Sequence, residues 1–169
     1  MLKNTAITVK IFVVVNSMND EFYMDIAIKE AQKALAAGDV PVGAVIVRNG
    51  DIIAQACNMR EAANDATAHA EIIAVREACR KLGSWRLNDC TIYVTLEPCP
   101  MCAGALVMSR MNRLVYGLPE GKTGAAESVF NIVDNKSLNH RLEVTAGICE
   151  NKCRELMQKF FKEKRNTVI

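Results

Sequence analysis

The chain has little of what would mark a specialised composition. Only 5% of its 169 residues are aromatic, and it contains four prolines and two histidines. Lys and Arg outnumber Asp and Glu by 21 to 19, so the net charge of +2 identifies no partner by itself. Half of the residues are hydrophobic, which excludes a disordered chain. A chain of this length has room for one domain with a core that needs no disulfides.

Long apolar runs are also missing. The run at residues 11–15 (IFVVV) has five residues, fewer than the roughly seven to fifteen of a signal peptide and far fewer than a membrane span needs. The seven cysteines are an odd, scattered set, which favours a reducing compartment and metal or catalytic use over a disulfide framework. We therefore expect a cytoplasmic protein that does not use a membrane.

The two ends of the chain differ from its middle. We expect the domain to span residues 18–165, because Asn19-Asp20-Glu21 offers a helix cap and an acidic first turn. Residues 1–17 would then be an extension: an extra edge strand, a disordered tail or an upstream start that is not used. Residues 150–165 carry six basic and three acidic side chains. That segment is either a solvated amphipathic helix or one that contacts phosphates.

Hydrophobic periodicity predicts alternating helices and strands between these ends. Helices are expected from residue 18 to Gly38, over 72–82, over 99–109 and after Gly147. Strands are expected over 42–47, 52–57, 91–96, 113–116 and 143–145, and Asn49-Gly50 is the favoured turn of a hairpin between the first two. The order predicts a three-layer α/β/α sandwich around a mixed five-stranded sheet.

One group of residues carries chemistry. Cys99 and Cys102 lie at i and i+3 of a predicted helix start, where free backbone N–H groups and the helix dipole favour thiolates. Pro98 suits this place because a helix start needs no N–H there. With His69 the thiolates make three ligands for a tetrahedral Zn²⁺ and leave the fourth position open, which is the catalytic pattern. We expect one zinc ion per chain; His140 is far off in sequence.

Glu71 follows His69 by two residues. At a helix start this spacing turns the two side chains about 200° apart, so Glu71 does not easily bind the same ion. It can still reach a water on that ion and carry its proton. CxxC and H-x-E are weak signals when each stands alone. Together, each opening a predicted helix, they indicate a catalytic zinc site, and the combination is the signature of zinc-dependent nucleobase deaminases.

From about Met18 to Phe161 the chain resembles the bacterial tRNA-specific adenosine deaminases of the cytidine deaminase-like superfamily. The resemblance is carried by the segments VPVGAV (40–45), TAHAEI (67–72), TLEPCPMCAGA (95–105), KTGAA (122–126) and NHR (139–141). Cytosine, guanine and riboflavin-pathway deaminases share the zinc motif. The last two segments resemble the tRNA branch and favour it.

The resemblance implies hydrolytic deamination of adenosine to inosine at the anticodon wobble position. It implies a homodimer that holds a tRNA anticodon stem-loop, for which we expect an arginine tRNA. His69, Cys99 and Cys102 match the zinc ligands, and Glu71 matches the proton shuttle. Contacts to the base or the RNA would come from Asn58, Val42, Ala70, Pro98, Glu120, Asn139, His140, Arg141 and Phe161. Among these, Asn58 would bond the purine and Val42 would line its pocket.

Three positions depart from the family pattern. Ala66 stands where a proline is usual, Glu120 where an aspartate is common and Glu127 where a glycine is usual.

Two other functions stay open from the sequence. One is a guanine or other free nucleobase or nucleoside deaminase with the same zinc motif. The other is a zinc-stabilised RNA-binding module or partner subunit, against which Glu71 argues because a structural metal site has no use for that acid.

Overall fold

The computed structural model describes the backbone of residues 3–167 and the side chains of residues 20–166. Its helices are α1 (Lys3–Ala36), α2 (Arg60–Ala63), α3 (Ala70–Leu82), α4 (Pro100–Met108) and α5 (Glu150–Thr167). Its strands are β1 (Gly43–Arg48), β2 (Asp51–Cys57), β3 (Cys90–Leu96), β4 (Arg113–Leu118) and β5 (Glu143–Ala146). The strands agree with the predicted ones to within two residues at each end.

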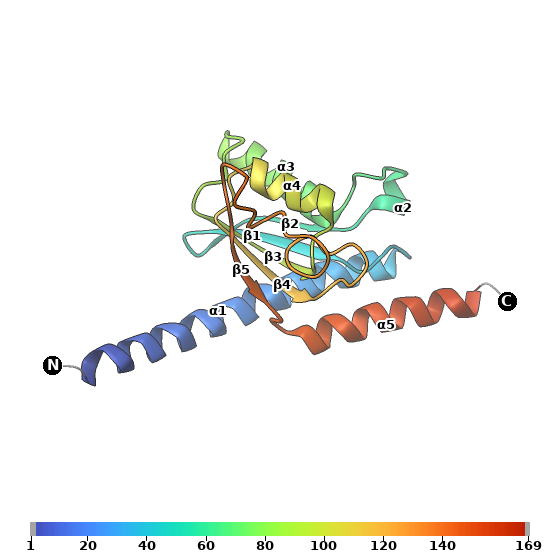
Figure 1. Cartoon of the computed structure of the whole chain (residues 1–169). Helices are drawn as coiled ribbons and strands as arrows, with labels where there is room; N and C mark the ends of the chain where they lie inside the picture. The colour runs from blue at the N-terminus through green and yellow to red at the C-terminus, as the bar shows by residue number, and fades with distance from the viewer. Residues whose placement is uncertain (1–2, 168–169) are drawn as a thin grey trace.

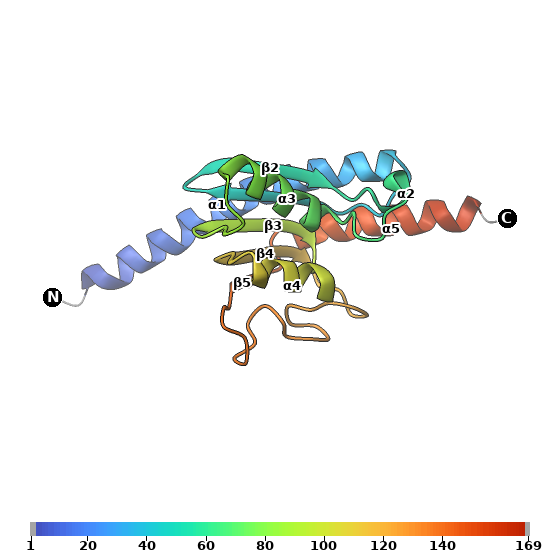
Figure 2. The same cartoon turned by 90° about the horizontal axis from the view of Figure 1, so that it is seen from above.

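The strands form one mixed sheet in the order β2-β1-β3-β4-β5. Strand β1 is antiparallel to β2 and β3, whereas β4 is parallel to β3 and β5. Helices α3 and α4 cover one face of the sheet and helices α1 and α5 the other (Figure 1, Figure 2). The predicted three-layer α/β/α sandwich with a mixed five-stranded sheet is confirmed.

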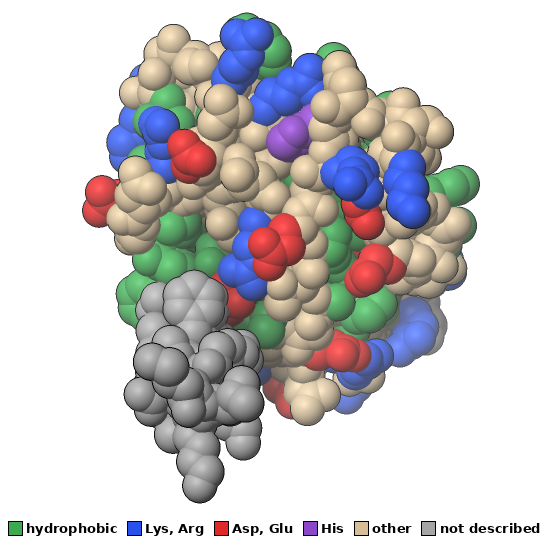
Figure 3. Space-filling view, turned by 60° about the vertical axis from the view of Figure 1, so that its left-hand side comes forward, with side chains coloured by type: hydrophobic (Ala, Val, Ile, Leu, Met, Phe, Trp, Pro, Cys, Tyr) green, Lys and Arg blue, Asp and Glu red, His purple; other side chains and the backbone are tan. Residues whose placement is uncertain are grey.

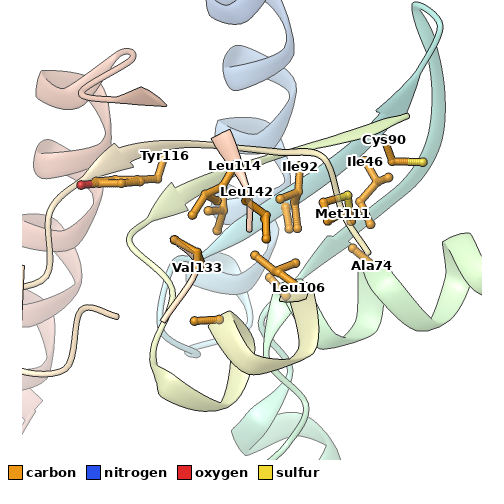
Figure 4. Close-up of a cluster of buried hydrophobic side chains, with 14 of the residues drawn as sticks. Ile46, Ala74, Cys90, Ile92, Leu106, Met111, Leu114, Tyr116, Val133 and Leu142 are labelled. Atoms are coloured by element: carbon orange, nitrogen blue, oxygen red, sulfur yellow. The ribbon is translucent and has the colours of Figure 1, made fainter. Parts of the chain in front are cut away.

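Successive residues of the central strands point into different cores, as the twofold repeat of a strand requires. Ile46 of β1 and Ile92 of β3 are fully buried in the core beneath α3 and α4. Their neighbours Val45 and Tyr93 belong to the core against α1 and α5. Figure 4 shows the first core, where Leu106 of α4 lies against the side chains from the sheet. Burying each large apolar side chain stabilises the fold by about 1.5–3 kcal/mol.

Positive backbone φ angles mark the turns that the sequence predicts. Asn49 and Gly50 have φ angles of 52° and 87°, as the two-residue turn between β1 and β2 requires. Gly83, with φ 63°, ends α3. Gly38, with φ 77°, lies in the turn after α1. These turns bring residues 39–42 and the end of β2 to the same end of the sheet as the starts of α3 and α4.

The predicted start of the first helix at Met18 is wrong, because α1 runs without a break from Lys3. Asp20 does not cap a helix; its carboxylate accepts hydrogen bonds from Tyr93 at 2.9 Å and from Arg113 at 2.9 and 2.8 Å. Asp20, which looks like a helix cap in the sequence, is therefore a buried side chain that binds two residues of the sheet. Residues 3–17 continue the helix beyond the sheet (Figure 1), so the alternative of an extra edge strand is wrong.

Two shorter elements also differ from expectation. The helix that carries the CxxC motif begins at Pro100, with Cys99 as its N-cap, so Pro100 rather than Pro98 occupies the helix start. Residues 60–63, expected within a loop, form the single turn α2, which ends at Asn64 with φ 50°. Asn tolerates this left-handed conformation better than other side chains do, apart from glycine.

Within residues 3–167, no helix combines the length and the apolar character needed to cross a bilayer.

Candidate metal and catalytic site

The starts of α3 and α4 bring the three predicted metal ligands together. His69 is the N-cap of α3 and Cys99 the N-cap of α4, both with extended backbone, and Cys102 lies in the first turn of α4. The ligand atoms of these three residues all lie within 4.8 Å of one another. Both helices begin directly after a loop at the same end of the sheet. His69 therefore meets Cys99 and Cys102, which follow it by 30 and 33 positions in the sequence.

The spacing of the donors fits tetrahedral zinc. Nδ1 of His69 lies 3.8 Å from the Cys99 sulfur and 3.6 Å from the Cys102 sulfur. Tetrahedral coordination with Zn–S near 2.3 Å and Zn–N near 2.05 Å places nitrogen and sulfur ligands about 3.6 Å apart. One imidazole and two thiols also form the donor set that Zn²⁺ favours over Mg²⁺ or Ca²⁺. The residues present therefore fit the metal.

The two cysteines differ in how readily they lose a proton. The hydrogen bond from the Cys102 thiol, aided by His69, lowers the pKa of Cys99 to about 4 in spite of its burial. The same hydrogen bond, together with burial, raises the pKa of Cys102. A cation at the three donors is what would allow both thiols to ionise, since metal binding releases ligand protons.

Glu71 lies in the first turn of α3 and is 4% exposed. Burial raises the pKa of its carboxyl group, although its own backbone N–H and the Cys102 side chain oppose the shift. A carboxyl with a raised pKa can hold and release a proton nearer to neutral pH than an exposed one. His69 and Glu71 line the same cavity despite the angle between their side chains.

The cavity beside these residues has a volume of about 250 Å³. It is lined by Val40, Val42, Asn58, Arg60, His69, Glu71, Leu96, Glu97, Cys99, Glu120, Thr123, Met157 and Phe161. Of the predicted substrate contacts, Val42, Asn58, Glu120 and Phe161 therefore share the cavity with the metal ligands. Met157 and Phe161 come from α5, so the last helix closes a site whose other walls come from the first 123 residues.

Glu97 is a cavity residue that the sequence did not indicate. It is 2% exposed, and its carboxylate accepts hydrogen bonds from the backbone N–H groups of residues 120, 126, 127 and 128 at 2.8–3.1 Å, and one from the Ser128 hydroxyl. Burial would raise the pKa of Glu97, but these donors outweigh it and hold the pKa below its ordinary value. Glu97 thereby anchors the loop that carries Glu120 and Thr123. Four N–H donors converging on one acid is a signal that only the folded chain contains.

The loop has a second anchor at one of the departures from the family pattern. The Tyr116 hydroxyl donates a hydrogen bond of 2.7 Å to Glu127. Glu127 thus fastens the loop to β4, in addition to its backbone bond to Glu97. Ala66, another departure, lies in an exposed loop whose Asp65 accepts hydrogen bonds from Thr67.

The other predicted contacts lie outside the cavity lining. Ala70 and Pro98 are buried beside it, and the Pro98 carbonyl accepts from the Ala125 N–H at 2.8 Å. Asn139, His140 and Arg141 line a separate, open depression of about 430 Å³. Asn139 accepts from Arg110, His140 bonds the Met111 carbonyl and Arg141 pairs with Asp134.

Surface charge is mixed rather than concentrated on the one face of the molecule that is shown in space-filling form. On the face shown in Figure 3, acidic and basic side chains are interspersed with uncharged ones. Helix α5 is amphipathic: Cys153 and Phe160 are buried, whereas the basic residues 159, 162, 164 and 165 are exposed. Both interpretations of this helix, solvated or phosphate-contacting, agree with that pattern.

The fold and this site define a deaminase. Residues 18–165 match the family described as MafB19-like deaminase, to which the chain belongs. It is 49% identical over 146 residues to the tRNA-specific adenosine deaminase of Bacillus subtilis, covering 86% of this chain and 91% of that protein. Within the deaminases, the chain belongs to the tRNA-specific adenosine deaminase family.

Two solved structures of deaminases are also similar to this chain. A structure from a study of A-to-I editing by tRNA deaminases at the wobble position is 41% identical, with a TM-score of 0.77 over 80% of this chain and 98% of that one. A guanine deaminase of Bacillus subtilis is 42% identical, with a TM-score of 0.58 over 66% of this chain and 70% of that one. The tRNA deaminase matches more completely, which favours the tRNA branch.

Proposed function

We propose that the chain catalyses the hydrolytic deamination of adenosine to inosine at the wobble position of a tRNA anticodon. The observation that carries this proposal is the meeting of a His/Cys/Cys donor set and the buried Glu71 at one cavity, in a member of this family. At about 250 Å³ the cavity is slightly smaller than ligand pockets of roughly 300–1,000 Å³, so it suits a single base.

His69, Cys99 and Cys102 would hold one zinc ion. The donor types and their separations support this assignment. When bound, zinc supplies a water that is activated for attack near neutral pH. With three protein donors, a tetrahedral ion would keep its fourth position open, which is the catalytic pattern.

Glu71 moves the protons. Its carboxylate accepts a proton from the attacking water and gives one to the ring nitrogen beside the amino-bearing carbon. It then takes the proton of the hydroxyl that has added to this carbon and passes it to the amine, which leaves as ammonia as the carbonyl forms, so adenosine and water become inosine and ammonia. The raised pKa of Glu71 suits this exchange, and acid–base help of this kind contributes about 10²- to 10⁴-fold.

The base would be held by the side chains around the cavity. Asn58 would bond the purine, Val42 would contact its ring, and Phe161 would pack near the bound loop. Anticodon loops present bases that are already partly unstacked, so little of the few kcal/mol for extruding a base is needed. By resemblance to the family, Glu120, Asn139, His140 and Arg141 would contact flanking RNA, and the working form would be a homodimer.

The experiment offers guanine, cytidine and an arginine-tRNA anticodon stem-loop together to the purified protein. We expect inosine at the wobble position and unchanged guanine and cytidine. Turnover of guanine with the RNA untouched would overturn the substrate assignment in favour of a free-base deaminase. Zinc-loaded protein that binds the stem-loop but forms no inosine would favour a non-enzymatic RNA-binding module.

A further inference from the structure

Asp39 is a fully buried acid next to residues of the cavity wall, and neither the zinc site nor the proton transfer uses it. It follows Gly38 in the turn after α1, and its own N–H donates to the Ala34 carbonyl at 3.0 Å. It does not line the cavity, so it cannot touch a bound base. Two residues that donate hydrogen bonds to its carboxylate, Val40 and Asn58, do line the cavity.

Both oxygens of the Asp39 carboxylate are engaged by N–H donors from three segments. Oδ1 accepts from the Val40 N–H at 2.8 Å and from Nδ2 of Asn58 at 2.7 Å. Oδ2 accepts from the Glu61 N–H at 2.9 Å. Charge-assisted hydrogen bonds of this kind are stronger than neutral ones, especially where water is excluded.

The bond to Asn58 determines how that amide is turned. A carboxylate facing three N–H donors can only accept, so the Asn58 atom beside it must be the NH₂ group. Turning the amide by 180° would set its carbonyl oxygen against the Asp39 carboxylate. Asn58 is only 6% exposed, and its backbone N–H is held by the Val42 carbonyl at 2.9 Å, so the side chain has little other freedom.

We propose that Asp39 is a positioning residue that fixes the orientation of the Asn58 amide, and thereby the pattern of donor and acceptor that the cavity offers to a purine. This inference rests on the proposed function, in which Asn58 bonds the base. With one N–H committed to Asp39, Asn58 presents Oδ1 and its second N–H in a fixed arrangement. A preorganised amide binds the base more tightly than one that populates both orientations.

Asp39→Asn removes the constraint at nearly constant size, because an amide in that place can accept from Asn58 or donate to it. The measurement is the base-dependent part of affinity: the ratio of the Kd for a stem-loop abasic at the wobble position to the Kd for one carrying inosine. We expect this ratio to fall at least about five-fold in Asp39→Asn. Asp39→Glu keeps an acceptor-only group and should retain more of the ratio than Asp39→Asn.

Two controls separate positioning from a structural effect. Asp20→Asn alters another buried acid, 4% exposed and bonded to Tyr93 and Arg113; it should lower the Tm and leave the ratio unchanged. In an Asn58→Ala background, Asp39→Asn should change the ratio no further, because its effect passes through Asn58.

The outcomes are distinguishable. A wild-type protein that forms no inosine and does not distinguish the two stem-loops would overturn the proposed function together with this inference. A wild-type protein that does both, with a ratio that Asp39→Asn leaves intact or that changes equally without Asn58, would overturn the positioning role alone.

Discussion

At the scale of single residues, the site depends on a division between groups that would hold the metal and a group that would move protons. Glu71 hydrogen-bonds with the Cys102 thiol, yet the three donors that converge are those of His69, Cys99 and Cys102. Its burial keeps the carboxyl out of bulk water while it faces the cavity. Removing it should therefore affect the reaction far more than the metal.

Glu71→Ala is expected to lower the rate of inosine formation by at least about 10²-fold, because the reaction loses its proton carrier. The zinc content should stay near one per chain, since the donors are untouched. Metal analysis and a stem-loop assay on the same preparation check both points. Loss of zinc from this variant would show that Glu71 is a ligand.

Cys102→Ala is expected to lose zinc and to lower the Tm, because metal binding contributes to folding free energy. Cys90→Ala is the matched control, since Cys90 is also fully buried but lies away from the donors. A chelator should lower the Tm of the wild type and of Cys90→Ala and have no effect on Cys102→Ala. Equal sensitivity of all three proteins to the chelator would contradict the ligand assignment.

At the scale of elements, the loop after β4 owes its place to buried contacts rather than to regular structure. Glu97 and Tyr116 both hold it through Glu127, one by its backbone N–H and the other by its carboxylate. At Gly124 an added Cβ would meet the Glu97 carboxylate and the Glu120 carbonyl, whereas at Gly121 it would meet nothing within 4 Å. Two glycines three residues apart thus differ in what they tolerate.

Gly124→Ala should destabilise the protein by roughly 1–3 kcal/mol through overpacking. It should also raise the KM for the stem-loop, since Glu120 and Thr123 on this loop line the cavity. Gly121→Ala should leave the free energy of unfolding within about 0.5 kcal/mol of wild type and the KM for the stem-loop unchanged. Urea unfolding and steady-state kinetics measure them; similar behaviour of the two variants would contradict the anchoring of the loop.

Two buried tyrosines tie elements together and give the fold a pH dependence. Burial, together with hydrogen bonds to Asp20 and Glu127, raises the pKa of Tyr93 and of Tyr116. The unfolded phenol ionises near pH 10, so stability is full below that pH and falls as pH rises toward the folded pKa. Each tyrosine contributes a slope of up to about 1.4 kcal/mol per pH unit.

Urea midpoints between pH 9 and 11 should therefore fall with pH, and less steeply in Tyr93→Phe or Tyr116→Phe. A slope that neither substitution changes would show that other groups govern the alkaline loss.

At the scale of the whole molecule, the sequence predicted the layers and the metal donors because both follow from local patterns. Alternating apolar residues, the Asn49-Gly50 turn and the H-x-E and CxxC spacings each lie within a few neighbouring positions. In the sequence Asp20 instead looks like part of a helix cap, and nothing distinguishes Asp39 or Glu97 from other acids. Their roles depend on partners brought together only by folding, such as Arg113, 93 residues from Asp20.

The role of residues 1–17 is a question about the whole molecule. The family match covers residues 18–165. Within that range, Asp20 of α1 forms a salt bridge with Arg113 of β4. Deletion of residues 1–17 should leave a folded protein with wild-type inosine formation. Circular dichroism and the stem-loop assay check this, and loss of solubility or activity would assign the segment a necessary part.

The wall that α5 contributes has a consequence for synthesis. The metal donors are complete once residue 102 has been made, but Met157 and Phe161 of the cavity wall come from α5, which is synthesised much later. A nascent or prematurely terminated chain would thus carry the donors with one side of the cavity missing. A complete cavity therefore requires that α5 has been synthesised and packed against the sheet.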